Sequence, residues 1–479
     1  MSVYLIRHAK AEKRSDWAQP DRLRPLNKTG HRQALGIVAR FADRPLERIL
    51  SSPALRCLET VDPLAACKGL AVENNEHLVE GGNLGAFVDL LTSFTGRNAV
   101  LCSHGDLIPA ALETLAARGM VLRVPLRCEK GSVWILENKK AEKAGTATYW
   151  EPCELERRRV GVLDLGSTSF HVLVADAQVD GRVEPLVRER SMLRLGSVIA
   201  SNAHVPEDVC ERAIETARSL AQTAEHAGAE TLMCVATAAL REAANGPQLA
   251  QRIAEVIAAP VRVLRGEEEA RVIHTAIRAR LPLPTAPILA LDLGGGSLEI
   301  AVDDEADVEW ETTLPLGITR LHGELVRHDP MTRAESEVLR KRVRSLLSPH
   351  APEIARRKPR LCVASGGTIR ALARLQLARD PHAAERELCN VHLAVRDLEA
   401  LARALLDSTH EERLRMPGMK RDRADLLPTG AVVLLAIAEV VGCDAFVVSD
   451  WGLREGMALA AVGAAKSPPF RGAERDARP

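Results

Sequence analysis

The stretch Ala290–Val302, ALDLGGGSLEIAV, decides how the second half of this chain folds. An apolar run reaches Asp292, three glycines and a serine follow, and apolar residues then alternate with others around Glu299. Because a period of two is typical of strands, the stretch predicts two strands joined by a tight glycine turn. Nearly the same pattern, VGVLDLGSTSFHVLVAD, occupies residues 160–176. The repeat predicts an internal duplication: two similar α/β domains, each opening with a strand–turn–strand unit.

Both glycine turns are suited to binding phosphate through the backbone. A Walker A loop and a dinucleotide fingerprint lead into helices, whereas these turns lead into strands, which excludes both motifs. A glycine turn instead lets backbone N–H groups approach an anion closely. The neighbouring acids would repel phosphate unless a hard cation, most simply Mg²⁺ with several waters, lay between them. One such turn alone favours a plain β-hairpin, but two matching turns favour a phosphate site.

Length and composition set the broad class of the protein. The chain has 479 residues, which suits three domains, and equal numbers of basic and acidic residues, 64 each, give no support for a general nucleic-acid or membrane binder. Ten cysteines without a CxxC pair argue against a zinc ribbon or disulfide scaffold and indicate a reducing compartment. The start, MSVYLIRHAK, lacks a signal-peptide core, and the longest apolar stretch, 431–441, is too short to span a bilayer. We therefore expect a soluble, cytoplasmic protein.

Domain boundaries follow from pattern and composition. The N-terminal region alternates strands with helical segments, and a polar, charged segment without an apolar period follows it. The proline-rich stretch LPLPTAP at 281–287 divides the repeated region. The predicted units are an N-terminal α/β domain at 1–136, a linker at 137–159, a first repeated domain at 160–284, a second at 285–465 and a disordered tail at 466–479.

The repeated region resembles the exopolyphosphatase/guanosine pentaphosphate phosphatase (Ppx/GppA) family. Seven segments carry the resemblance in the family's order: DLGSTSFHVLVAD, VATAALREA, GEEEARVIHTAI, LDLGGGSLEI, LPLGITRL, SGGTIRAL and SDWGLREGM. The resemblance covers residues 160–465 and implies the actin-like, ribonuclease H-like architecture, in which two α/β domains enclose a cleft. It also implies hydrolysis of a terminal phosphoanhydride bond.

The resemblance assigns phosphate-binding roles residue by residue. The two glycine turns and the Ser-Gly-Gly-Thr segment resemble the family's phosphate loops, and Arg241 resembles its phosphate-facing arginine. Thr168 stands where the family usually has asparagine, so it offers a hydroxyl without an amide donor. The expected phosphate-binding residues are Gly166, Ser167, Thr168, Ser169, Arg241, Gly294, Gly295, Gly296, Ser297, Gly366, Gly367 and Thr368.

The resemblance also assigns the acids of the cleft. Asp164, Asp292 and Glu299 are expected to hold Mg²⁺. Glu269 resembles the family's catalytic glutamate, with its neighbour Glu268 as an alternative. Phosphoryl transfer to water mainly requires positioning and charge neutralisation, which carboxylates, a metal ion and N–H donors supply.

A second candidate site lies in the N-terminal domain. Arg7 and His8 end the first predicted strand, in YLIRHAKAE, and His104 ends another, in VLCSHGD. Arg56 stands near a helix start, in SSPALRCLET. Two histidines and two arginines form a cationic cluster that can hold a phosphate, with one imidazole nitrogen free to attack phosphorus.

This cluster resembles the histidine phosphatase (phosphoglycerate-mutase-like) superfamily, SixA type, over residues 1–136. By position His8 is the nucleophile, Arg7, Arg56 and His104 form the phosphate pocket, and no cofactor is expected. A pseudo-phosphatase kept for binding is the alternative interpretation. The general acid is expected to be Glu80, with Glu76 and Asp106 as alternatives.

We therefore predict a fusion of two phosphatases. The C-terminal module is expected to hydrolyse inorganic polyphosphate, with guanosine pentaphosphate (pppGpp) or a general nucleotide as the alternative substrate. A regulatory protein that binds polyphosphate or a nucleotide with little turnover is an alternative interpretation, and a homodimer is also possible from the sequence. Basic runs at 340–344, 356–360 and 413–423 would suit RNA, but no aromatic residues are interleaved. We interpret most of these runs as solvated surface and expect neither a nucleic-acid nor a membrane partner.

Overall fold

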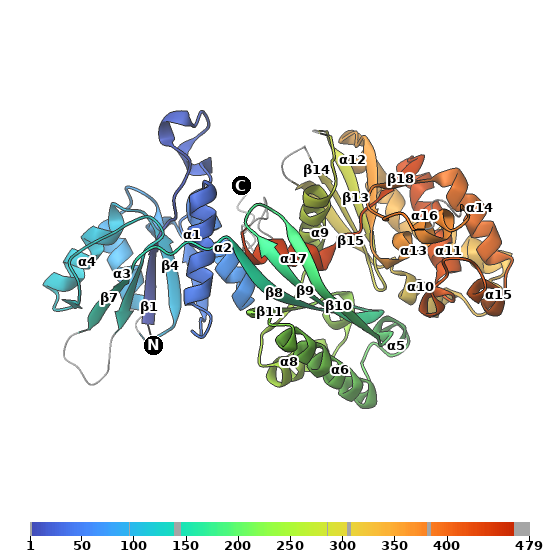
Figure 1. The fold of residues 1–479 in the computed structure, drawn as a ribbon, viewed down its shortest axis with the longest axis horizontal. Coiled ribbons are helices and arrows are strands. Elements are labelled where there is room, and N and C mark those ends of the chain that lie inside the picture. Colours follow the sequence, from blue (N-terminus) through green and yellow to red (C-terminus); the bar gives the residue numbers. More distant parts are fainter. Residues whose placement is uncertain are drawn as a thin grey trace.

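The structure is a computed structural model that describes residues 2–94, 96–137, 145–284, 286–303, 308–380 and 385–463. It contains a seven-, a five- and a six-stranded sheet in chain order, and Figure 1 shows the three parts in a row, from blue through green to orange. The predicted α/β class is confirmed. The predicted tail at 466–479 lies outside the described residues. Within these ranges, no helix is long and apolar enough to cross a membrane.

The N-terminal sheet has the strand order β3–β2–β4–β1–β6–β7–β5. Its strands are β1 (Ser2–Arg7), β2 (Arg48–Ser51), β3 (Val72–Asn74), β4 (Ala99–Ser103), β5 (Val121–Leu122), β6 (Val133–Glu137) and β7 (Thr146–Trp150), and its helices are α1 (Lys28–Arg40), α2 (Leu55–Lys68), α3 (Leu84–Ser93) and α4 (Leu107–Ala117). β1 pairs in parallel with β4, with Arg7 opposite Ser103. The two strands therefore end side by side, at the edge of the sheet where α/β proteins bind ligands.

Strand β7 lies inside the predicted linker 137–159, which the structure therefore shortens. Residues 146–150, TATYW, pair antiparallel with β6 as part of the N-terminal sheet. Threonine, tyrosine and tryptophan favour strands, but the charged residues around this short run obscure that signal in the sequence. The remaining connector, 151–156, runs along α1, where the Leu155 N–H donates to Arg32 O (3.0 Å).

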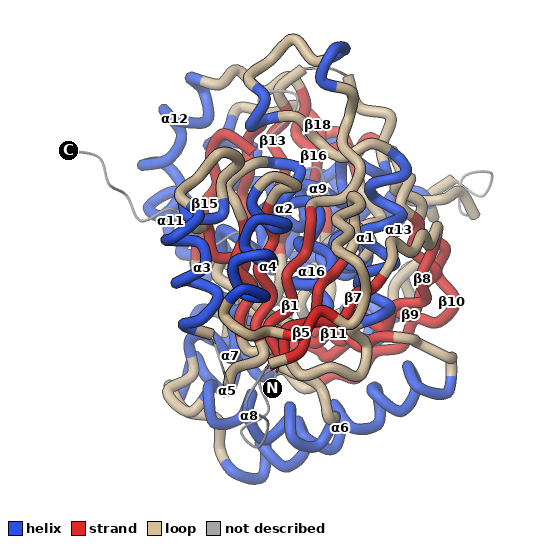
Figure 2. Tube along the Cα trace, turned by 90° about the vertical axis from the view of Figure 1, so that its left-hand side faces the viewer, coloured by secondary structure: helices blue, strands red, loops and turns tan. Residues whose placement is uncertain are grey.

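The second sheet has the order β10–β9–β8–β11–β12. Its strands are β8 (Arg157–Leu165), β9 (Ser169–Gln178), β10 (Val183–Met192), β11 (Thr231–Ala236) and β12 (Val261–Val263), and its helices are α5 (Leu195–Asn202), α6 (Glu207–His226), α7 (Ala238–Glu242) and α8 (Gly246–Ile257). α6 buries its apolar face against β8 and β9. Figure 2 shows α6 and α8 together along one side of the molecule.

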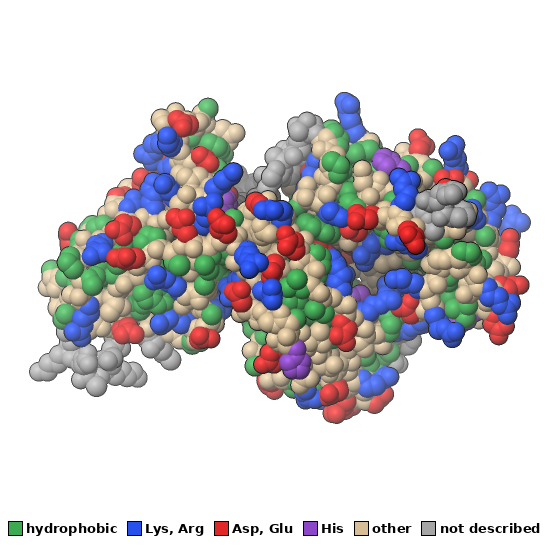
Figure 3. Space-filling model, viewed as in Figure 1, with side chains coloured by type: hydrophobic (Ala, Val, Ile, Leu, Met, Phe, Trp, Pro, Cys, Tyr) green, Lys and Arg blue, Asp and Glu red, His purple; other side chains and the backbone are tan. Residues whose placement is uncertain are grey.

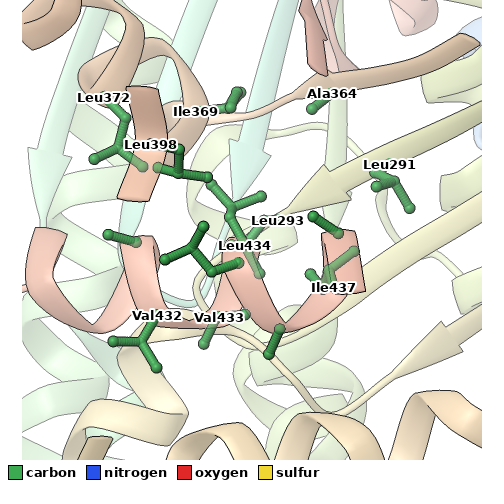
Figure 4. Packing of buried hydrophobic residues seen from close by; sticks show 14 of the residues in the cluster. Leu291, Leu293, Ala364, Ile369, Leu372, Leu398, Val432, Val433, Leu434 and Ile437 are labelled. Atoms are coloured by element: carbon green, nitrogen blue, oxygen red, sulfur yellow. The ribbon is translucent and has the colours of Figure 1, made fainter. Parts of the chain in front are cut away.

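The third sheet has the order β15–β14–β13–β16–β18–β17. Its strands are β13 (Ile288–Leu293), β14 (Leu298–Asp303), β15 (Val308–Leu314), β16 (Leu361–Ser365), β17 (Val391–Ala394) and β18 (Ala445–Val448), and its helices are α10 (Ile318–Leu325), α11 (Arg333–Leu347), α12 (Ala351–Arg356), α13 (Gly367–Leu377), α14 (Val395–Leu406), α15 (His410–Leu414) and α16 (Leu427–Val441). α16 contains the longest apolar stretch of the chain and is the buried centre of this unit, packed against α11, α13 and α14. Figure 4 shows its side chains interlocking with Leu293, Ile369 and Leu398.

The predicted duplication is confirmed by strand register. Asp164 pairs with His171 across the first glycine turn, and Asp292 pairs with Glu299 across the second. Each hairpin is extended by a further antiparallel strand, β10 or β15, and has a parallel strand, β11 or β16, on its other side. The turns therefore occupy equivalent positions in two copies of one architecture.

Two helices, α9 (Gly266–Arg280) and α17 (Leu453–Ala461), are exchanged between the repeated units. α9 packs against β13, β14 and β15, whereas α17 packs against β8, β9 and α9. The two helices cross at Gly456, where a Cβ atom would lie 2.3 Å from the Val272 carbonyl oxygen. The predicted units 160–284 and 285–465 therefore do not separate in space, because each of these helices buries its apolar face in the other unit.

Candidate active sites

The two glycine turns meet in a cleft of about 870 Å³ between the second and third sheets. A Cβ atom on Gly295 would lie 2.0 Å from Thr168 Oγ1, and one on Gly296 would lie 2.3 Å from Ser167 Oγ. Only glycine permits so close an approach. The amides of these four residues donate to no acceptor in the described part of the chain, so they can bind an anion.

The first residues of α10 hold the second glycine turn in place through backbone hydrogen bonds. The Ile318 N–H donates to Gly294 O (3.0 Å), and the Thr319 N–H donates to Gly295 O (2.9 Å). The hydroxyls of Thr319 and Thr168 also share a hydrogen bond, which ties the two turns together. The Thr168 hydroxyl, expected to face phosphate, is thus engaged in joining the two halves of the cleft.

The third predicted phosphate loop, Ser-Gly-Gly-Thr, begins α13 and completes the cleft. Gly366 has a φ of 95°, and a Cβ atom there would lie 2.9 Å from Asp292 Oδ1. Arg241 is the one expected phosphate-binding residue that does not line the cleft, because its guanidinium donates to Leu264 O (2.9 Å) and Glu269 Oε2 (3.2 Å). The expected residues that do line it are Gly166, Ser167, Thr168, Ser169, Gly294, Gly295, Gly296, Ser297, Gly366, Gly367 and Thr368.

Four of the carboxyl groups that line the cleft have raised pKa values: Asp164, Glu269, Asp292 and Glu299. Burial raises the pKa of Asp164 to about 6 and that of Glu299 to about 7, and in both cases the Asp292 carboxylate adds to the rise. Burial also raises the pKa of Asp292, and it raises that of Glu269 well above the usual value, with Glu299 adding to the effect. Buried like charges are costly, so the group favours protons or a bound cation.

The predicted metal ligands are oxygen donors of the type that Mg²⁺ takes. Asp292 accepts a hydrogen bond from Ser365 Oγ, and Asp164 Oδ2 lies 3.1 Å from Arg454 Nη1. Among the described residues, no three histidine, cysteine or acidic side chains converge closely enough to hold a metal by themselves. A magnesium ion here would therefore need waters and phosphate oxygens beside one or two carboxylates, which is its usual coordination.

The structure separates the two glutamates proposed for the catalytic role. Glu269 lines the cleft and accepts a hydrogen bond from Arg241. Glu268 instead caps α9 by accepting the Arg265 N–H (3.0 Å), and it pairs with Arg262 (2.9 Å). The two side chains leave the helix in different directions because adjacent residues lie about 100° apart on it.

Three arginines and a histidine that the sequence did not single out lie where the cleft meets a neighbouring groove. Four side chains line both the cleft and a neighbouring groove of about 1020 Å³: His171, Arg370, Arg423 and Arg454. Burial and the surrounding arginines hold the pKa of His171 well below its usual range. Arg423 belongs to the basic run 413–423, which was interpreted as mostly solvated, yet its Nη2 atom would lie 2.4 Å from a Cβ atom on Gly367.

The groove beside the cleft is strongly basic. Glu189 is the one acid in its lining, as far as the structure describes the chain. Figure 3 shows Lys and Arg side chains bordering the hollow where the green and orange parts of Figure 1 meet. The cations that line the groove are Arg188, Arg190, Arg370, Arg374, Lys420, Arg423 and Arg454.

The second site lies where β1 and β4 end. The rings of His8 and His104 are 5.3 Å apart. The Nδ1–H of His8 donates to Ala9 O (2.8 Å), which places the lone pair on Nε2. Burial lowers the pKa of His8 to about 3, and His104 and Arg56 also disfavour its charge. His8 is therefore neutral near pH 7, as a nucleophile must be.

Arg56 is buried in a set of groups that orient it. Its Nη2 donates to Glu80 Oε2 (2.7 Å) and lies 3.4 Å from His104 Nδ1, and its Nη1 donates to Asp21 O (2.9 Å). The Nε atoms of Arg56 and Arg7 are buried and have no hydrogen-bond partner among the described residues. Because a buried donor without an acceptor is costly, these two atoms mark positions that suit phosphate oxygens.

The candidates for the general acid differ in what they contact. Glu80 touches Arg56, within the cluster. Asp106 instead accepts the Gly81 N–H (2.6 Å), and Glu76 is exposed in a short 3-10 helix. The structure thus brings Glu80, and neither of the two alternatives, into contact with Arg56.

The segment after β1 adds three residues that the sequence did not single out: Arg14, Asp21 and Arg24. Asp21 forms ion pairs with Arg14 (3.0 Å), Arg24 (2.8 Å) and Arg56 (3.1 Å). These residues come from a loop in which charges follow no period, so no pattern pointed to them. Asp21 therefore holds the Arg56 guanidinium, and Arg14 also pairs with Glu80 (3.2 Å).

Fold and sites together define the class of the protein: an actin-like phosphohydrolase fused to a histidine phosphatase. Comparison with known proteins agrees, because the model of the Ppx/GppA phosphatase family matches residues 173–464 and that of the histidine phosphatase superfamily (branch 1) matches residues 3–87. The chain belongs to the Ppx/GppA phosphatase family and carries a histidine phosphatase unit at its N-terminal end. It is a phosphatase of the hydrolase class.

Similar proteins cover the C-terminal module. Exopolyphosphatase 1 of Mycobacterium tuberculosis is 32% identical over 302 residues, which are 63% of this chain and 87% of that protein. The crystal structure of an exopolyphosphatase from Cytophaga hutchinsonii is 27% identical with a TM-score of 0.58, covering 62% of this chain and 96% of that one. The Aquifex aeolicus member of the Ppx/GppA family is 25% identical with a TM-score of 0.54, covering 64% of this chain and 98% of that one.

Proposed function

We propose that the C-terminal module is an exopolyphosphatase, which removes the terminal phosphate of inorganic polyphosphate. The observation that carries the proposal is the basic groove that continues the cleft, with seven Lys or Arg side chains against one acid. Its lining, as described, contains no Phe, Tyr or Trp on which a nucleobase could stack. Regularly spaced negative charge without a base is the chemistry of a polyphosphate chain, and relatives named as exopolyphosphatases support the same substrate.

In the proposed reaction, the free amides of the glycine turns bind the oxygens of the terminal phosphate. Glu269 takes a proton from the attacking water, aided by its raised pKa and oriented by Arg241. A bond forms between the water oxygen and phosphorus as the bond to the bridging oxygen breaks, and that oxygen stays with the shortened chain. Mg²⁺, held by Asp164, Asp292 and Glu299, would neutralise charge on the phosphate oxygens.

For the N-terminal unit, we propose hydrolysis through a phosphohistidine, without a metal. His8 Nε2 attacks phosphorus, and the leaving group departs with a proton from Glu80. The unpaired Nε atoms of Arg7 and Arg56, with His104, hold the phosphate oxygens. Water then gives a proton to Glu80 and attacks phosphorus, the bond between phosphorus and His8 Nε2 breaks, and inorganic phosphate and the free imidazole result.

The test is phosphate release from polyphosphate and from pppGpp, with and without Mg²⁺. The variants are Glu269→Gln, His8→Ala and, as a matched control, Glu267→Gln, which alters an exposed acid in the same helix turn. We expect Mg²⁺-dependent release from polyphosphate that is lost in Glu269→Gln and kept in the other two.

Other outcomes would change the assignment. Faster release from pppGpp than from polyphosphate would make the module a guanosine pentaphosphate phosphatase. Tight polyphosphate binding without turnover would make it a regulatory binding protein. Release lost only in His8→Ala would assign the activity to the N-terminal unit.

A further inference from the structure

The N-terminal unit shares its core with the C-terminal module. Helix α2 packs against both β11 and α17. A single buried cluster contains Val61 and Leu64 of α2, Val162 and Val235 of the second sheet, and Met457 of α17. Figure 1 shows α17 between the N-terminal unit and the third sheet. The elements that carry the cleft are therefore in direct contact with the N-terminal unit.

Helix α17 connects this contact to the cleft. At its start, Arg454 lies 3.1 Å from Asp164, and the buried Glu455 pairs with Arg188. At its end, the Ala461 carbonyl oxygen lies 3.8 Å from Cys67 Sγ of α2. One short helix thus spans from the N-terminal unit to the acids of the cleft.

Arg262 on β12 makes a second connection. Its Nη1 donates to Leu70 O (3.1 Å), just beyond α2, and its Nη2 donates to Glu268 Oε1 (2.9 Å). The Arg262 and Glu268 side chains are 13% and 9% exposed. Because Glu268 caps α9 and Glu269 follows it, the backbone that places Glu269 is held through Arg262 by a carbonyl of the N-terminal unit.

The small space around this contact shows that Arg262 belongs to the interface. A void of about 240 Å³ is lined by Ala66, Cys67 and Gly69 of the N-terminal unit, and by Arg262 and Met457 of the module, among others. A guanidinium can hold a carbonyl and a carboxylate at the same time in a fixed plane, which a lysine ammonium cannot. Removal of Arg262 would leave the Glu268 carboxylate buried with a poorer set of partners.

We propose that Arg262 is a positioning residue for Glu269, and that the N-terminal unit is through this contact a structural part of the active site in the cleft. The proposal rests on the proposed function of the cleft. It gives the N-terminal unit a role in the activity of the module that does not require turnover at His8. It also gives a physical reason for the continuous core between two phosphatases in one chain.

The test compares Arg262→Gln and Arg262→Lys with Arg265→Gln in the full chain. Arg265 also approaches Glu268 (3.4 Å), but it is 56% exposed and is not part of the contact with α2. We expect Arg262→Gln to lower kcat on polyphosphate about tenfold at unchanged KM, because small displacements of a reacting group are costly while the phosphate loops stay intact. Arg262→Lys should recover part of this loss, and Arg265→Gln should stay within twofold of wild type.

Amide hydrogen exchange of residues 265–272 provides a readout that does not depend on turnover. Faster exchange there in Arg262→Gln than in Arg265→Gln supports the proposal even if the substrate is not polyphosphate. A kcat within twofold of wild type, an equal loss in Arg265→Gln, or unchanged exchange would overturn it. The proposal would also be overturned if the loss of kcat in Arg262→Gln were fully explained by a smaller folded fraction, as measured by thermal unfolding. Absence of any Glu269-dependent phosphate release would instead refute the proposed function.

Discussion

Replacing Arg423 by glutamine should weaken polyphosphate binding while leaving the empty protein at least as stable. Arg423 lies against Gly367 at the junction of cleft and groove, and no acid of the described residues forms an ion pair with it. Burial lowers its pKa to about 10, and Arg190 adds to this effect, so its charge is costly until an anion arrives. Hydrogen bonds to a charged group contribute about 1.5–3 kcal/mol, so the loss should raise the Kd of polyphosphate about 10- to 150-fold.

The assay is equilibrium binding of polyphosphate in a Glu269→Gln background, which prevents turnover, together with thermal unfolding of the unbound protein. Lys341→Gln is the matched control, because it removes one exposed charge from α11 at a position that lines neither the cleft nor the groove. We expect Arg423→Gln to bind more weakly with an unchanged or higher Tm, and Lys341→Gln to behave as the parent. A lower Tm with unchanged Kd would refute the reasoning, because Arg423 would then be structural.

Three further predictions concern the glycine turns and the two sites. Gly295→Ala places a Cβ atom 2.0 Å from Thr168 Oγ1, so it should lower the free energy of unfolding in urea by about 1–3 kcal/mol and abolish polyphosphate turnover. Turnover at the wild-type rate would contradict the contact between the two turns. Burial raises the pKa of Glu299 to about 7, so ionisation of this group lowers the stability of the fold as pH rises from about 4.5 to 7. Glu299→Gln should therefore raise the Tm at pH 8 without Mg²⁺ and reduce the stabilisation that Mg²⁺ gives. An unchanged effect of Mg²⁺ on the Tm would exclude this carboxylate as a ligand. Burial lowers the pKa of His8 to about 3, so the contribution of the neutral imidazole to stability is complete above about pH 6.5 and is lost as pH falls towards 3. In urea unfolding, His8→Asn should therefore lose less stability than wild type between pH 7 and 5. Equal losses in the two proteins would contradict a neutral His8.

The glycine turns could be predicted from the sequence because their requirement is local. A strand must end, the backbone must turn within a few residues, and side chains must be absent where the other turn approaches. The repeat of Asp-Leu-Gly identified both turns, and the structure brings them within contact of each other at Gly295 and Thr168. The strand-end histidines were equally visible, since parallel strands place their carboxyl ends together.

The arginines of the cleft could not be predicted in the same way. Arg370 and Arg454 stand in segments that marked the family resemblance, but nothing near them in sequence shows that they face one imidazole, His171. That convergence depends on α13 and α17, which are far apart in the sequence of the second repeated unit. A charge on a helix is normally solvated, so only the tertiary structure distinguishes these arginines from the rest.

The exchange of α9 and α17 shows a further limit of sequence patterns. A helical period shows which face is apolar but not which sheet that face covers. Both helices follow a strand of one unit and cover the other, and boundaries drawn at the proline-rich hinge therefore cut through a shared core. The same exchange brings Glu269 and Arg454 into the lining of one cleft.

The two sites handle phosphate with opposite electrostatics, and this contrast predicts how each depends on pH. At His8, Arg7 and Arg56 lie beside a neutral imidazole, so we expect the substrate itself to supply the negative charge and propose no metal for this site. In the cleft, Asp164, Glu269, Asp292 and Glu299 lie beside a row of arginines, and burial and neighbouring carboxylates raise their pKa values. Near pH 6 Asp164 and Glu299 are partly protonated, so a divalent cation must compete with protons for them. Activity of the cleft should therefore rise with pH through the range 6–7 and shift to lower pH as Mg²⁺ increases, whereas His8 does not titrate in that range.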